Sequence, residues 1–130
     1  MGIIESNGIY FVNHVLHGYV HKYGSSRNGD VDIEHLNFFK NADTLSEIIS
    51  DVGKALAGEF DLINDPDLTN NIAIAEITPT EIVYYDCYGK DIIAKSSLED
   101  FKEKAIAWRL FLQTPPFNGS RVRWWKRPWK

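Results

Sequence analysis

Apolar residues recur three or four positions apart in two segments of the chain, 45–57 and 97–112. This spacing places side chains on one face of an α-helix, so each segment is predicted to form a helix that buries its apolar face. The predicted buried faces are Leu45, Ile48, Ile49, Val52 and Leu56 in the first helix, and Leu98, Phe101, Ala105, Trp108 and Leu112 in the second.

Polar residues indicate where these helices begin and end. Thr44 with Glu47, and Ser96 with Glu99, have the spacing of a capping box, in which two side chains bond the free amides of the first turn. Gly58 is a suitable stop for the first helix, and a Pro-Pro pair after residue 114 ends the second.

Three short apolar runs, 72–77, 81–87 and 91–95, lie between the helices and are separated by turn residues. The first alternates isoleucine with alanine, as a strand does when it buries one face. Together the runs predict an antiparallel meander. We therefore expect a single α+β domain, with two main helices packed on an antiparallel sheet.

The segment 9–23 fits two interpretations. A helix would align Val12, Leu16 and Tyr19 in an apolar stripe and end at Gly24. Strands would suit its many Ile, Tyr, Phe and Val residues equally well, and Gly18 disfavours a helix. We favour strands after residue 17, with the turn-rich loop 24–30 closing a hairpin between 18–23 and 31–36.

Charge divides the chain unevenly. The 130 residues include 14 Lys and Arg against 18 Asp and Glu, a net charge of −4. Five of the bases and no acid lie in 120–130, which leaves nine bases against 18 acids in 1–119. The chain is thus predicted to have an acidic domain, 1–119, followed by a basic, tryptophan-rich tail, 120–130. An acidic domain repels nucleic acid and attracts basic partners.

Two acidic clusters are candidates for contact with such a partner. In a strand, alternation would place Asp30, Asp32 and Glu34 on one face. The second cluster comprises Glu59, Asp61, Asp65 and Asp67, whose spacing does not match a calcium-binding loop. Exposed charges speed association and help to select the partner, whereas the alternative for each cluster is an ordinary solvated surface.

The basic tail interleaves Arg and Lys with Trp124 and Trp125. Such a segment can stack on bases and pair with phosphates, or lie at a membrane interface. It can also dock on the acidic domain or contact a protein. We favour docking, then protein contact, and include both tryptophans among the candidate partner-binding residues. No apolar run is long enough to span a membrane.

Histidines are the main candidates for metal-binding or catalytic chemistry. His14, His17 and His21 would share one face of a helix and bind a metal there, but strands would separate them. His17 and His35 with Lys22 would suit acid–base cleavage of RNA, although an acidic domain is a poor surface for a polyanion. We therefore predict no metal, no cofactor and no enzymatic activity.

The single cysteine, Cys87, lies in an apolar run and is predicted to be buried. One cysteine permits no intrachain disulfide, which suits a reducing compartment, and no signal peptide is recognised at the start of the chain. Phosphate-binding loops and hydrolase signatures are also missing from the sequence.

With its acidic α+β domain, its two acidic clusters, its many aromatic residues and no enzymatic motif, the chain resembles the small cytoplasmic immunity proteins of bacterial contact-dependent growth inhibition and related polymorphic toxin systems. The resemblance implies tight binding to a cognate toxin domain, often a nuclease, and blockade of its active site. Acidic side chains would mimic substrate phosphates, and aromatic residues would anchor the contact. The alternatives are a nucleic-acid-binding or regulatory protein that uses the tail, and a small hydrolase or nuclease that uses histidines.

Overall fold

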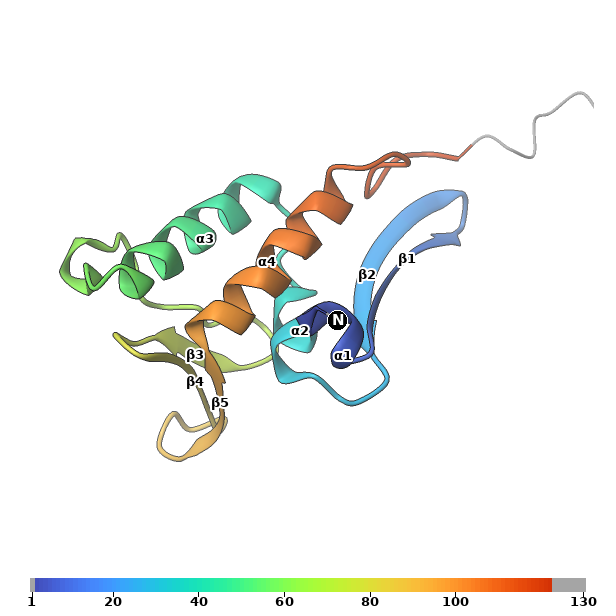
Figure 1. Ribbon diagram of the computed structural model, residues 1–130. Helices are drawn as coiled ribbons and strands as arrows, with labels where there is room; N and C mark the ends of the chain where they lie inside the picture. Colours follow the sequence, from blue (N-terminus) through green and yellow to red (C-terminus); the bar gives the residue numbers. More distant parts are fainter. Residues whose placement is uncertain (1, 123–130) are drawn as a thin grey trace, which may run out of the picture.

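Two antiparallel sheets lie toward opposite ends of the long helix α4 in the computed structural model, which describes residues 2–122 (Figure 1). The elements are α1 (Ile3–Ser6), β1 (Ile9–Leu16), β2 (Tyr19–Ser26), α2 (Val31–Leu36), α3 (Ala42–Leu56), the 3-10 helix η1 (Phe60–Leu62), β3 (Ile74–Ile77), β4 (Glu81–Tyr85), β5 (Ile92–Ser97) and α4 (Leu98–Leu112). The predicted α+β class with two main helices is confirmed, and the strands form two sheets, β1-β2 and β3-β4-β5. None of the helices in this part of the chain is long and apolar enough to cross a bilayer.

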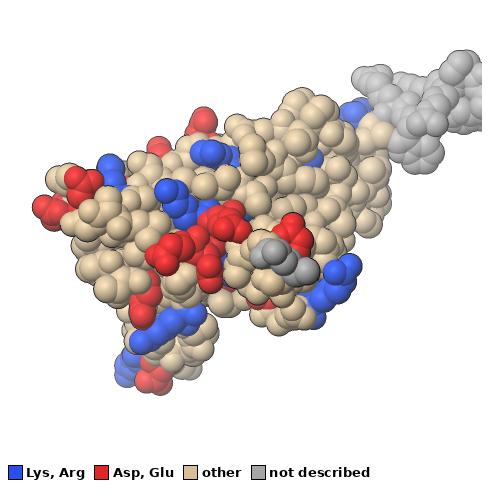
Figure 2. Space-filling view, in the orientation of Figure 1, with Lys and Arg blue, Asp and Glu red and all other residues tan. Residues whose placement is uncertain are grey.

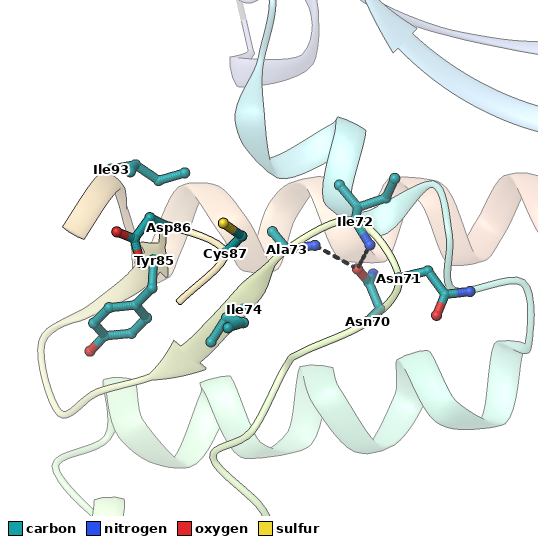
Figure 3. A pocket seen from close by; sticks show the side chains of 9 residues that line it. All are labelled: Asn70, Asn71, Ile72, Ala73, Ile74, Tyr85, Asp86, Cys87 and Ile93. Atoms are coloured by element: carbon teal, nitrogen blue, oxygen red, sulfur yellow. Dashed lines mark hydrogen bonds between the residues drawn. The ribbon is translucent and has the colours of Figure 1, made fainter. Parts of the chain in front are cut away.

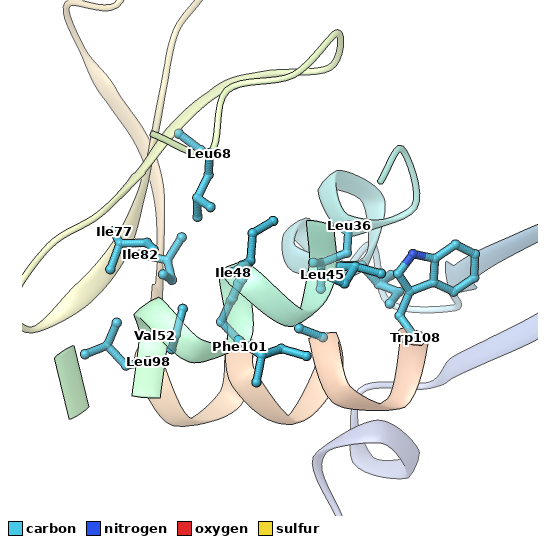
Figure 4. Close-up of a cluster of buried hydrophobic side chains, with 14 of the residues drawn as sticks. Leu36, Leu45, Ile48, Val52, Leu68, Ile77, Ile82, Leu98, Phe101 and Trp108 are labelled. Carbon is cyan, nitrogen blue, oxygen red and sulfur yellow. The ribbon is translucent and has the colours of Figure 1, made fainter. Parts of the chain in front are cut away.

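The hydrophobic core lies between α3, α4 and the β3-β4-β5 meander (Figure 4). All of the predicted buried positions of α4 are buried, and so are those of α3 except Leu56, which is 37% exposed at the end of its helix. Ile77 and Ile82 add the inner face of the meander to this core, and Trp108 closes it at the other end. The helical periodicity therefore predicted the core faces of α3 and α4 correctly. The alternation of isoleucine with alanine did not predict the buried face of β3, where Ala75 and Ile77 are buried while Ile74 is half-buried and Ile72 is 49% exposed.

The helix caps differ from those expected. Asn41, not Thr44, caps α3, because its side-chain oxygen accepts the N–H groups of Asp43 (2.8 Å) and Thr44 (3.2 Å). Ser97, not Ser96, caps α4 and accepts the N–H of Asp100 at 3.0 Å. An N-cap residue has extended backbone and directly precedes the helix. Because α3 begins at Ala42 and α4 at Leu98, Asn41 and Ser97 occupy these positions, and both have extended backbone.

The N-terminal segment forms a hairpin between β1 and β2, paired from Ile9↔Ser26 to Leu16↔Tyr19. The two-residue turn is His17-Gly18, and both residues have positive φ (54° and 81°), as the tight turns that match strand twist require. The expectation of strands after residue 17 is confirmed. The predicted pairing of 18–23 with 31–36 is wrong, because 31–36 is helix α2 and the short turn places β1 beside β2 instead.

The beginning of the predicted tail lies against this hairpin. Backbone bonds join Val20 N–H to Ser120 O (2.9 Å), Gly119 N–H to Val20 O (2.8 Å) and Val122 N–H to Gly18 O (2.7 Å). Residues 119–122 therefore extend the sheet along the second edge of β2. Trp124 and Trp125 lie outside the described residues.

Candidate partner-binding surfaces

The first acidic cluster does not form a surface stripe. Asp30 precedes α2 and caps it by accepting the N–H of Ile33 at 2.9 Å, so Asp32 and Glu34 follow helical spacing. Asp32 is 0% exposed, while Glu34 is exposed. The prediction that all three share one strand face is therefore wrong, and Asp32 has no exposed surface with which to contact a partner.

Asp30 and Asp32 instead form a buried ion cluster with Lys104 of α4. The Lys104 ammonium lies 2.8 Å from an Asp30 oxygen and 2.9 Å from an Asp32 oxygen. Burial alone would lower the pKa of Lys104, but its hydrogen bonds to the two carboxylates and their charges outweigh this and raise the pKa. The cluster holds α2 against α4.

The remaining bonds of Asp32 come from the meander. The Tyr84 hydroxyl donates to it at 2.6 Å, and the Ser96 hydroxyl donates to its other oxygen. Burial, followed by the Asp32 charge, raises the pKa of the Tyr84 phenol, which keeps this donor protonated. Asp32 thus joins α2, β4, β5 and α4, and its role is structural.

The three candidate catalytic residues occupy separate surroundings. His17 lies in the exposed hairpin turn, and Lys22 faces inward from β2. His35 is buried in α2, where Nε2 donates to the Leu68 carbonyl at 2.6 Å and Nδ1 has no hydrogen-bond partner among the described residues. Burial is the main cause that lowers the pKa of His35. No group of three His, Cys, Asp or Glu side chains within residues 2–122 is placed to hold a metal.

The second acidic cluster is exposed, as its proposed role needs. Glu59, Asp61, Asp65 and Asp67, here called the acidic loop, follow α3, and all four are exposed. In residues 2–122, none of them forms an ion pair with a lysine or arginine. The acidic loop therefore presents four carboxylates that remain available to an external cation.

Hydrogen bonds hold the acidic loop in a defined conformation. Buried Asp51 of α3 accepts the N–H groups of Asn64 (2.9 Å) and Asp65 (3.2 Å). Asp67 in turn accepts the N–H of Thr69 at 2.9 Å, and this bond is the main cause that lowers the pKa of Asp67. A carboxylate that is held in this way stays ionised over a wider pH range.

A shallow pocket follows the acidic loop in the chain, between residues 70–74 and the end of β4 (Figure 3). It is lined by Asn70, Asn71, Ile72, Ala73, Ile74, Tyr85, Asp86, Cys87 and Ile93. Cys87 is exposed here, so the prediction of a buried thiol is wrong. The reason is that β4 ends at Tyr85, and Cys87 belongs to the turn that follows.

A third surface, the outward face of the β1–β2 hairpin, was not predicted from the sequence. Inward-facing Val20 and Lys22 are buried, whereas the alternate residues of β2 are exposed. The register adds the residues opposite them on β1. This hairpin face consists of Tyr10, Val12, His14, Leu16, Tyr19, His21, Tyr23 and Ser25, and it contains no Asp, Glu, Lys or Arg. Alternation would have revealed it only if 9–23 had been assigned to two strands.

Acidic residues are segregated along the chain and also in space. Apart from Glu5, the other 17 acids lie within 30–103, while 6–29 and 104–130 hold nine of the 14 bases and no acid. The hairpin packs on the C-terminal half of α4, where Phe11 stacks with Phe111 at 5.4 Å between ring centroids. On the face seen in Figure 2, most acids lie on the part of the molecule that holds α3, the meander and the start of α4, and few lie toward the hairpin. The hairpin, the C-terminal half of α4 and residues 113–122 thus form one end of the molecule, here called the acid-free end, whereas Lys104 lies farther along α4 beside Asp30 and Asp32.

Comparisons of the chain with protein-family models, with curated proteins and with solved structures found no match.

Proposed function

We propose that this chain is a cytoplasmic binding protein that inhibits a basic protein domain, and specifically an immunity protein that neutralises a cognate toxin domain such as a nuclease. The observation that carries this proposal is the acidic loop, whose four carboxylates are exposed and have no ion-pair partner among residues 2–122. A nuclease active site is basic because it binds phosphates, so a group of exposed carboxylates is complementary to it.

The conformation of the acidic loop supports this role. A binding surface that is ordered before the partner arrives loses less entropy when the complex forms. Asp51 holds the loop against α3, and Asp65 accepts the N–H of Asp67 at 3.0 Å. The loop would therefore present its carboxylates at fixed spacing rather than as a mobile acidic segment.

The pocket beside residues 70–74 would supply the apolar part of the contact. Ile72 and Ile93 are 49% and 62% exposed at its border. Interfaces commonly combine a charged rim, which speeds association, with a few apolar contacts that are desolvated in the complex. The acidic loop and this pocket would together form the inhibitory surface.

An immunity protein should be encoded directly downstream of a large secreted toxin, so the test first examines the gene upstream of this chain and, if it encodes such a protein, takes its C-terminal domain as the candidate toxin. Co-expression with this chain should rescue growth, and the purified proteins should form a complex. Reversing Asp61, Asp65 and Asp67 to lysine should slow association at least about tenfold at low salt and weaken its salt dependence, because electrostatic steering is lost.

A matched control reverses the same number of charges elsewhere. Glu5, Glu47 and Glu99 are exposed and lie outside the acidic loop, so reversing them gives the same net charge. This control should bind within about threefold of the wild type, since only long-range charge has changed. Equal effects of the two triple variants, or failure of the chain to rescue growth, would contradict the proposal.

A further inference from the structure

We propose that the hairpin face is a binding site for single-stranded nucleic acid, distinct from the inhibitory surface proposed above. Three tyrosines on this face are 38–42% exposed, and the adjacent inward-facing residues of β2 are buried. Exposed aromatic rings on a sheet face stack on unpaired bases, whereas a duplex keeps its bases stacked inside. The site would therefore recognise bases by stacking and the backbone by charge.

The rings are arranged as a ladder. The register places Tyr10 opposite Ser25, Tyr23 opposite Val12, His14 opposite His21, and Tyr19 opposite Leu16. Each of these four outward-facing rungs therefore carries at least one ring, and the rings of His14 and Tyr23 lie 6.3 Å apart. Successive rungs on one face are separated by two residues, which is roughly 6.7 Å. This is about twice the 3.4 Å between bases in a duplex strand, so an extended single strand can place one base on each rung.

Arginines lie at both ends of the ladder. The Arg27 guanidinium is 5.5 Å from the centroid of the Tyr10 ring, and that of Arg121 is 5.7 Å from the Tyr19 ring. Both contacts show that the rings accept a flat cation, and both place positive charge beside the aromatic face. The phosphates of a nucleic-acid strand that lies along the ladder would come near these two arginines, one at each end.

The distribution of charge favours a polyanion over a protein as the occupant. A protein interface can be aromatic and uncharged at its centre, but it does not require acids to be excluded from the whole end of a molecule. Here 6–29 and 105–130 hold eight bases and no acid; Lys22 is buried, and four of the others, Arg123, Lys126, Arg127 and Lys130, follow directly after residue 122. Residues 119–122, which bond to Gly18 and to the start of β2, thus lead into the most basic part of the sequence.

The experiment measures fluorescence anisotropy of the full chain with labelled oligo-dT and oligo-U of roughly twelve nucleotides. Both should bind, and affinity should fall steeply between about 50 and 200 mM salt. Tyr23→Ala should weaken binding about tenfold, whereas Tyr23→Phe should bind like the wild type, because stacking needs the ring and not the hydroxyl. Tyr88→Ala is the matched control, since Tyr88 is 81% exposed but lies in the turn after β4, away from the hairpin.

Each other outcome decides against the proposal. Lack of binding to both oligonucleotides overturns it. If inorganic polyphosphate or a duplex binds as tightly as the single-stranded oligonucleotides, charge alone attracts the ligand. If Tyr23→Ala binds the oligonucleotides as tightly as the wild type, the bases do not stack on the ladder. If Tyr23→Ala weakens the complex with the toxin candidate but not that with the oligonucleotides, the face binds protein. Reversal of the acidic loop should leave oligonucleotide binding intact or stronger, so the two proposals can fail separately.

Discussion

Each end of the molecule buries one lysine, and the two ammonium groups have opposite surroundings. In the acidic region, Lys104 is 4% exposed and pairs with Asp30 and Asp32. At the acid-free end, Lys22 is 1% exposed and faces no carboxylate in the described part of the chain. The pKa of Lys104 is raised by its carboxylate partners against the effect of burial, whereas burial lowers that of Lys22.

Lys22 is held by neutral groups. Its ammonium donates to the side-chain oxygens of Asn13 (2.7 Å) and Thr114 (3.4 Å) and lies 3.9 Å from the centroid of the Phe111 ring. Amide, hydroxyl and aromatic groups thus surround the Lys22 ammonium, whereas carboxylates surround that of Lys104. The exclusion of acids from this end therefore extends to its interior in the described part of the chain.

The largest test of this difference is removal of the Lys104 charge. Lys104→Met should lower the free energy of unfolding by about 3–5 kcal/mol, because it leaves two buried carboxylates without a cation. Urea denaturation followed by circular dichroism measures this loss. Lys102→Met, on the same helix and half-buried, should cost less than about 1 kcal/mol. A loss below that value for Lys104→Met as well would show that the carboxylates do not depend on their ion pair.

The ion cluster also shows where prediction from the sequence ends. Helix periodicity and strand alternation are local patterns, so α3, α4 and the meander were predictable from short windows. The contact between Lys104 and Asp32 spans 72 residues, and no local pattern indicates it. The alternation of Asp30, Asp32 and Glu34 suggested a strand, but the Asp30 side chain caps a helix and reverses that assignment.

The candidate surfaces were predictable to different degrees. The acidic loop was a candidate contact surface on its charge alone, and its four acids are exposed. The hairpin face was missed because residues 9–23 satisfy both helical and strand spacing. Only the His17-Gly18 turn fixes which of these residues lie opposite one another.

A second test concerns His35, the buried titratable group beside the ion cluster. Its folded-state pKa lies below the unfolded value of about 6.5, so the unfolded chain binds the proton more readily. Stability is therefore complete above about pH 6.5 and declines as the pH falls toward the folded pKa, by at most about 1.4 kcal/mol per pH unit for one proton. Asp32 is the acid whose charge opposes the decline, and the rings of Phe39 and Tyr84 pack against the imidazole.

Denaturation curves of wild type and His35→Gln between pH 7.5 and 5 measure this contribution. The difference in unfolding free energy between them should shrink as the pH falls, since only the wild type loses stability by protonating this site. His17→Gln, in the exposed turn, is the control and should follow the wild type. A constant difference between wild type and His35→Gln would mean that His35 does not titrate differently on folding.

The smallest expected effect is at Lys22. Lys22→Met should change the free energy of unfolding by less than about 1 kcal/mol, because no buried carboxylate loses its partner and the apolar side chain can still pack on Phe111. Asn13 and Thr114 are exposed, so water can replace the ammonium as their hydrogen-bond partner.

The pH dependence distinguishes the two lysines by sign. The lowered pKa of Lys22 means that its folded state releases the proton first, so its contribution to stability grows as the pH rises toward the unfolded value of about 10.4. The raised pKa of Lys104 gives the reverse, a contribution that is complete below about 10.4 and lost as the pH rises through the folded value. As the pH rises in urea titrations, the free energy of unfolding of the wild type should therefore increase relative to that of Lys22→Met. Relative to that of Lys104→Met, it should decrease. If both differences move in the same direction, the acid-free end does not hold its lysine by neutral groups alone.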